Sequence, residues 1–125
     1  MPVKQRLIFI VDDDQLTSTM LSDHLKENPL NDVTIFSTGE ECIRNLTLNP
    51  DVIILDYTLN SADKGAADGL QILEQIKKVD NDVRVIMLSA QNDYGKALQT
   101  ILKGAAEYVI KDDEAFKRID HLLGN

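Results

Sequence analysis

Five short apolar runs alternate along the chain with stretches in which apolar residues are three or four positions apart. The runs are rich in β-branched residues and almost continuous, as strands are when both faces of their sheet are buried. We therefore expect five strands, over residues 7–11, 33–36, 52–55, 83–88 and 108–110.

The intervening stretches have the spacing of amphipathic helices. Ser37 or Thr38 is a suitable N-cap for the second helix, with a following Glu completing a capping box. Gly104 is suited to the left-handed position that ends the fourth, and Asp112 or Asp113 to the N-cap of the fifth. We expect the apolar stripes to be core residues: Leu16, Met20 and Leu25; Cys42, Ile43 and Leu46; Leu70, Leu73 and Ile76; Ala97, Leu98, Ile101 and Leu102; Phe116, Ile119, Leu122 and Leu123.

Five strand–helix units in 125 residues predict one α/β domain over residues 1–125, with no output domain in the chain. Strands that alternate with helices form parallel sheets with right-handed crossovers. A doubly wound, flavodoxin-like (βα)5 sheet of strand order 2-1-3-4-5 suits this length. A closed eight-stranded barrel needs about twice as many residues.

Composition and charge limit the partners, the chemistry and the cellular compartment that we expect for this protein. With 21 acidic and 13 basic residues, the net charge of −8 argues against direct binding to nucleic acid or to an anionic membrane. Cys42 is the only cysteine and is expected to be a small core residue rather than a nucleophile. The first apolar run is too short for a signal peptide, and no stretch is long enough to span a membrane, so we expect a cytoplasmic protein.

Polar residues follow four of the five expected strands at the point where each strand ends. In open α/β sheets, sites form at this carboxyl edge, near the switch in strand order. Carboxylates that converge there repel one another, and Mg²⁺ relieves that repulsion because it prefers oxygen ligands. A lysine and a hydroxyl beside them would suit a phosphoryl group carried on a carboxylate. The residues are Asp12, Asp13 and Asp14 after the first strand, Asp56 after the third, Ser89 after the fourth and Lys111 after the fifth.

This ordered set resembles the receiver domain of two-component response regulators over essentially the whole chain. The resemblance implies that Asp56 accepts a phosphoryl group from a sensor histidine kinase or a histidine phosphotransfer protein. It further implies a downstream protein partner or a phosphorylation-promoted homodimer. It implies that Asp13, Asp56 and the Thr58 backbone carbonyl ligate Mg²⁺ directly and that Asp12 does so through water. It also implies that Ser89 and Lys111 contact the phosphoryl group and that Ser89 and Tyr108 form the switch.

The chain departs from the family pattern in two places. Asn60 replaces a usual Pro, and the matching Gly is Gly69, so a longer loop lies between them. Asp112 replaces the Pro that usually follows Lys111. A cis bond before a residue other than Pro costs about 3 kcal/mol or more, so we expect a trans bond there.

Two other interpretations remain open at this point. Asp12-Asp13-Asp14-Gln15-Leu16-Thr17 loosely matches the nucleophile motif of a haloacid-dehalogenase-like phosphatase, which would carry its phosphate on Asp12. A pseudo-receiver, an interaction module that is not phosphorylated, would account for the missing Pro and the longer loop. On the favoured interpretation the protein is not an enzyme for an external substrate and catalyses only its own phosphorylation and dephosphorylation.

Overall fold

The computed structural model describes residues 4–59 and 68–124. Five parallel strands form one sheet in the order β2-β1-β3-β4-β5, which confirms the predicted α/β class and strand order. The strands are β1 (Arg6–Val11), β2 (Asn31–Phe36), β3 (Val52–Asp56), β4 (Arg84–Ser89) and β5 (Glu107–Ile110). The helices are α1 (Gln15–Leu25), α2 (Gly39–Arg44), α3 (Gly69–Val79), α4 (Tyr94–Leu102) and α5 (Ala115–Leu123), with a short 3-10 helix, η1 (Leu46–Leu48).

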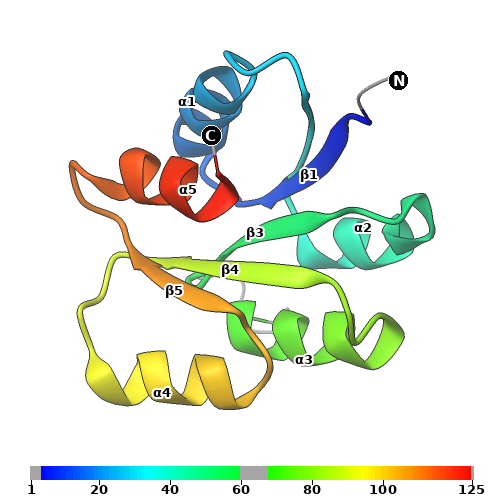
Figure 1. The fold of residues 1–125 in the computed structure, drawn as a ribbon. Helices are drawn as coiled ribbons and strands as arrows, with labels where there is room; N and C mark the ends of the chain where they lie inside the picture. Colours follow the sequence, from blue (N-terminus) through cyan, green and yellow to red (C-terminus); the bar gives the residue numbers. More distant parts are fainter. Residues whose placement is uncertain (1–3, 60–67, 125) are drawn as a thin grey trace.

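Helices cover both faces of the sheet: α1 and α5 lie on one side, and α2, α3 and α4 on the other (Figure 1). Side chains alternate along β1 between two buried clusters. Ile8 and Ile10 pack on the side of α1 and α5, and Phe9 and Val11 pack on the side of α2 and α3. The central strands are therefore apolar on both faces, which explains their continuous apolar runs. None of the described helices has the length and apolar character needed to cross a membrane.

Helix α1 is buried differently from the prediction. Leu16 and Met20 are exposed, Leu16 by 70%, whereas Leu21 and Leu25 are buried together with Ser18 and Ser22. At about 100° per residue, Leu16 and Met20 lie nearly opposite this buried face. Two serines therefore occupy part of the buried face, and the two apolar residues are left on the outer surface.

Helix α4 is also turned away from the expected orientation. Thr100 is its buried side chain, and its hydroxyl donates a hydrogen bond to the Lys96 carbonyl. Leu98, Ile101 and Leu102, which were expected in the core, are exposed, and so is Tyr94. This helix therefore presents apolar side chains outward.

The helix ends follow the prediction in part. Thr38 caps α2 by accepting a hydrogen bond from the Glu41 amide, and Gly104 has the left-handed φ of 112° just after α4. The predicted Asp cap of α5 is wrong, because this helix starts at Ala115 with Glu114 as its N-cap. Asp112 instead accepts a hydrogen bond from the Glu114 amide in the turn before the helix. Cys42 is fully buried, as predicted.

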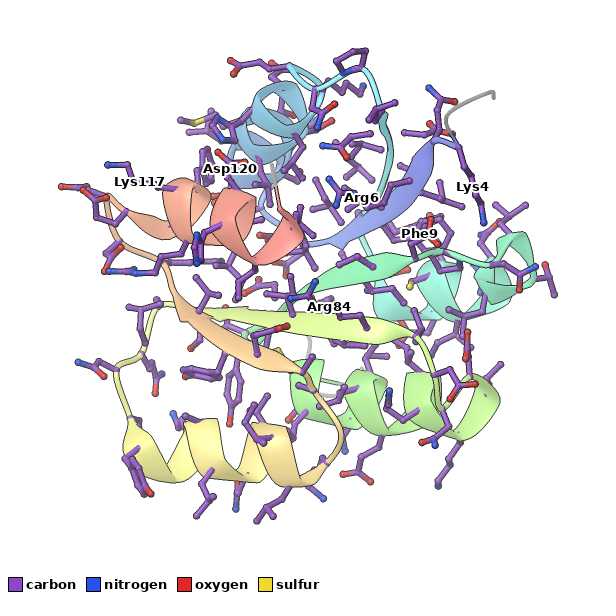
Figure 2. The ribbon with its side chains drawn as sticks, viewed as in Figure 1. Lys4, Arg6, Phe9, Arg84, Lys117 and Asp120 are labelled. Carbon is purple, nitrogen blue, oxygen red and sulfur yellow. The ribbon has the colours of Figure 1, made fainter. Side chains whose placement is uncertain are left out.

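Two arginines hold the last turn of α5 (Figure 2). Arg6 on β1 donates to the Leu123 carbonyl, and Arg84 on β4 donates to the Leu122 carbonyl at 2.9 Å. The last carbonyls of a helix have no partner within the helix, so these guanidinium groups satisfy them. Arg84 is also paired with Glu107 of β5.

Candidate functional site

Three carboxylates meet at the carboxyl edge of the sheet. Asp12 and Asp13 directly follow β1, and Asp56 is the last residue of β3, which pairs with β1. One oxygen from each lies within 4.8 Å of the other two. Asp12 and Asp56 are only 4% and 3% exposed, whereas Asp13 is open to solvent. Because the strands are parallel, residues far apart in the chain form one acidic cluster.

Lys111 brings a positive charge to this cluster from the end of β5. Its ammonium group lies 3.0 Å from Asp56 Oδ1 and 3.6 Å from Asp12 Oδ2. Burial alone would lower the pKa of Lys111, but the carboxylates of Asp56 and Asp12 outweigh it and raise the pKa above the ordinary value. Lys111 is therefore cationic at neutral pH and is held against Asp56.

The charged form of Asp12, which lies next to Asp56, is disfavoured by its surroundings. Burial raises its pKa from 3.8 to about 6, and the charge of nearby Asp56 acts in the same direction. The hydrogen bond that Asp12 Oδ1 accepts from the Asp14 amide and the charge of Lys111 only partly oppose this effect. One lysine thus does not compensate three carboxylates, two of which are buried.

The donor set fits a hard divalent cation. Carboxylate oxygens are the ligands that Mg²⁺ prefers, and an exposed carboxylate such as that of Asp13 leaves room for the waters that Mg²⁺ retains. A depression of about 390 Å³ opens beside Asp12 and Asp13 and is also lined by Ser37 and Glu41. Asp14 has a different task, because its side chain caps α1 by accepting from the Leu16 amide and the Thr17 hydroxyl.

Thr58 contacts Asp56 in a way that the sequence did not indicate. Its amide lies 3.2 Å and its hydroxyl 3.3 Å from Asp56 Oδ1. The family resemblance implies a role only for its backbone carbonyl, and a residue two positions after a strand end gives no signal for its side chain. The backbone of Gly69 lies close to that of Asp56, because a Cβ added at Gly69 would be 2.4 Å from the Asp56 carbonyl oxygen.

Ser89, fully buried at the end of β4, is linked to β5 through Gln91. The Ser89 hydroxyl oxygen accepts from the Gln91 amide at 3.1 Å, and the Tyr108 hydroxyl donates to the Gln91 carbonyl at 2.8 Å. Gln91 was not identified from the sequence, since it acts mainly through its backbone. The Tyr108 ring meets the edge of the Tyr57 ring, so the residue after Asp56 contacts the expected switch residue.

Of the two departures from the family pattern, the longer loop lies mostly outside the described residues and Asp112 lies within them. The longer loop between Asn60 and Gly69 falls mostly at 60–67, outside the described residues. The bond between Lys111 and Asp112 is trans, as expected, since no cis peptide bond occurs in the described ranges.

Comparison with known proteins agrees with this geometry. The family model of the response regulator receiver domain matches residues 8–121. The chain belongs to this family. That membership replaces the phosphatase interpretation.

Relatives of this receiver domain include proteins of about its own length and longer ones. It is 30% identical to the chemotaxis protein CheY of Listeria monocytogenes over 92% of this chain and 93% of the relative. It is 28% identical to the CheY of Bacillus subtilis over 86% and 87% of the two chains. It is also 30% identical to the transcriptional regulatory protein PrrA of Mycobacterium leprae, over 83% of this chain but 42% of PrrA.

Solved structures show the same fold. The receiver domain of DrrB from Thermotoga maritima, in its beryllium-fluoride-activated form, matches with a TM-score of 0.78 and 27% identity over 97% of this chain and 99% of that one. A receiver domain of a putative LuxO repressor from Vibrio parahaemolyticus matches with a TM-score of 0.83 at 24% identity over 96% and 88%.

Proposed function

We propose that this receiver domain is a phosphorylation-dependent switch in which Asp56 accepts a phosphoryl group in an Mg²⁺-dependent reaction. One observation carries the proposal: Asp56 is buried within an acidic cluster, yet one of its oxygens is held 3.0 Å from the Lys111 ammonium group. A buried carboxylate with a cation in contact is oriented as a nucleophile, and carboxylates form acyl phosphates in this way.

In the proposed reaction, a carboxylate oxygen of Asp56 attacks the phosphorus of a phosphohistidine on the donor. The new P–O bond forms as the P–N bond breaks, and the electron pair of that bond leaves with the imidazole. Lys111, which contacts Asp56, would hold a phosphoryl oxygen. Ser89 Oγ accepts from the Gln91 amide, and its hydroxyl would donate to another phosphoryl oxygen.

Mg²⁺, when bound, would neutralise charge on the phosphoryl oxygens. Asp13, Asp56 and the Thr58 carbonyl would hold it, with Asp12 acting through water. The Thr58 hydroxyl, which contacts Asp56 here, would fix the orientation of the nucleophile.

The exposed end of α1 is the surface we assign to the phosphodonor, a sensor histidine kinase or a histidine phosphotransfer protein. Leu16 and Met20 are open to solvent on this helix, which starts beside the carboxylate cluster. A groove of about 300 Å³ continues from Met20 to Lys111 and Phe116. Apolar side chains at the rim of the site would let a helical donor bring its phosphohistidine to Asp56.

We assign the readout to the face formed by α4, β5 and α5. Tyr108 is tied to the loop after Ser89 through Gln91, so movement of Ser89 toward a phosphoryl group would change the support of Tyr108. Helix α4 follows that loop and exposes apolar residues, among them Leu98 and Ile101. A downstream protein, or a second copy of the chain, would bind there more tightly after phosphorylation.

The test is incubation of the protein with Mg²⁺ and acetyl phosphate, followed by intact-mass measurement. One phosphoryl group, labile to hydroxylamine, is expected on the wild type and on the D93N control. D93N removes an exposed carboxylate but leaves an equally good helix cap. Equal phosphorylation of D56N would refute the assignment of Asp56. A wild-type chain that takes up no phosphoryl group and binds no Mg²⁺ would instead establish the pseudo-receiver alternative.

A further inference from the structure

The turn that follows Lys111 is built around Asp112. The Asp112 amide donates to the Ile110 carbonyl at 3.0 Å, and its carbonyl accepts from the Ala115 amide at 3.1 Å. Its carboxylate oxygen Oδ1 accepts from the Glu114 amide at 2.9 Å and from Arg118 at 2.7 Å. Main chain and side chain of one residue thus fix the course of the backbone between β5 and α5.

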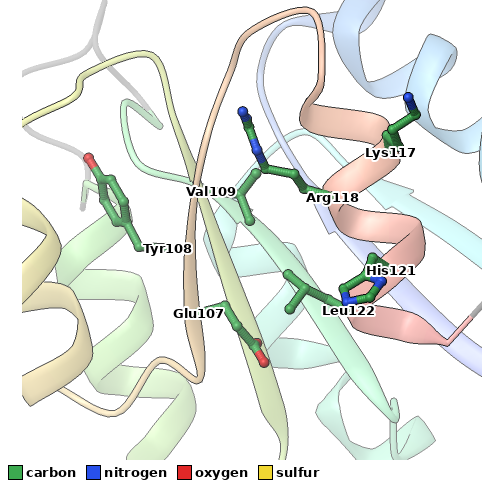
Figure 3. A pocket seen from close by; sticks show the side chains of 7 residues that line it. All are labelled: Glu107, Tyr108, Val109, Lys117, Arg118, His121 and Leu122. Carbon is green, nitrogen blue, oxygen red and sulfur yellow. The ribbon is translucent and has the colours of Figure 1, made fainter.

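Arg118 connects this turn to a rigid part of the molecule. It lies in α5, which is fixed to the sheet by buried Ala115, Ile119 and Leu123. Figure 3 shows the Arg118 side chain extending from α5 past Val109 of β5, while Lys117 points away from the strand. Arg118 also lines the groove of about 570 Å³ between β5 and α5. Its guanidinium therefore holds Asp112 from a helix whose own position is set by the core.

This turn directly follows Lys111 and fixes the backbone from which its side chain reaches the carboxylate cluster. A lysine side chain is long and flexible, so its reach is decided by where its backbone is fixed. On the side of β4, the Lys111 amide donates to the Ser89 carbonyl at 2.7 Å. On the other side, the next residue is Asp112, and its carboxylate is the group that Arg118 holds.

We propose that Arg118 is a positioning residue that, through Asp112, holds Lys111 in reach of the phosphoryl group on Asp56. This inference rests on the proposed function. The hydrogen bond from Arg118 also lowers the pKa of Asp112, so the carboxylate is ionised at neutral pH. Because both side chains are about half exposed, the effect should be moderate, about two- to fivefold in rate.

The experiment compares phosphorylation rates with acetyl phosphate at saturating Mg²⁺. R118A should react about two- to fivefold more slowly than wild type, and D112A at least as slowly. The double variant should be no slower than D112A, because both changes break the same contact. The Mg²⁺ concentration for half-maximal rate should stay unchanged, which separates positioning of Lys111 from damage to the carboxylate cluster.

K117A is the matched control. Lys117 is the adjacent cation of α5, but it is paired with Glu114 on the exposed surface and does not contact Asp112. Its rate should equal that of wild type. A wild-type rate in R118A, additive losses in the double variant, or equal slowing in K117A would each overturn the inference. Failure of the wild type to accept any phosphoryl group would refute the proposed function itself, so the two failures are distinguishable.

Discussion

Ionisation of Asp12 should destabilise the metal-free protein. Burial raises its pKa in the folded chain to about 6, from 3.8. Below pH 4 the group is protonated in both the folded and the unfolded state, and above pH 6 it is ionised in both. Because the folded state holds the proton more tightly, stability falls as the pH rises between these values. At about 1.4 kcal/mol per pKa unit, the loss amounts to up to about 3 kcal/mol.

The D12N variant isolates this effect. Asn keeps an oxygen that can accept from the Asp14 amide but carries no charge at any pH. Urea unfolding of both proteins without Mg²⁺, followed by circular dichroism from pH 4 to pH 7.5, gives the difference in free energy of unfolding. Wild type should lose up to about 3 kcal/mol relative to D12N across this range. Carboxylates that do not interact with Asp12 titrate alike in both proteins and cancel in the difference, so the difference reports Asp12 together with its coupling to Asp56.

A second measurement compares the free energy of unfolding with and without Mg²⁺. A ligand that binds only the folded state at ten times its Kd stabilises by about 1.4 kcal/mol. The gain for wild type should be larger at pH 7.5 than at pH 5, since protons compete with the metal for Asp12. A difference between wild type and D12N that does not change with pH would refute the account of Asp12 as a buried, destabilising carboxylate.

Two further predictions concern packing. G69A should lower the free energy of unfolding by about 1–3 kcal/mol, because the added Cβ meets backbone atoms of Asp56 and Tyr57 that cannot rotate away. G95A, whose Cβ has an ordinary contact at 3.4 Å, should instead stabilise α4 slightly, and equal urea midpoints for the two variants would contradict this reasoning. Cys42, whose pKa burial raises to about 12, should react with iodoacetamide only as fast as the protein unfolds. Rapid labelling of the native protein at pH 8 would contradict its burial.

Sequence patterns predicted the sheet well because its strands are buried on both faces. The continuous apolar runs indicated the number of strands, and their alternation with helices indicated the doubly wound strand order. The polar residues after four of the five runs indicated the carboxyl edge of the sheet. Asp12, Asp13, Asp56 and Lys111 meet there, as parallel strands require.

The patterns were less informative for helices. Leu16 and Met20 have helical spacing, yet α1 buries two serines instead. Spacing shows that residues share a helix face but not whether that face meets the sheet. Contacts made by main-chain atoms, such as the Gln91 carbonyl, carry no residue signature at all. Asp112 is a residue type that often caps helices, but here its carboxylate accepts a hydrogen bond within the turn before the helix.

The two arginines at the end of α5 determine how this helix is able to move. Arg6 and Arg84 attach its final turn to β1 and β4. Its first turn follows the loop from Lys111, where the proposed chemistry occurs. We therefore expect the helix axis of α5 to stay in place on phosphorylation, with the change confined to the turn before Ala115 and to the first amides of the helix. Amide hydrogen exchange should accordingly change most in the first turn of α5 and least around Leu123.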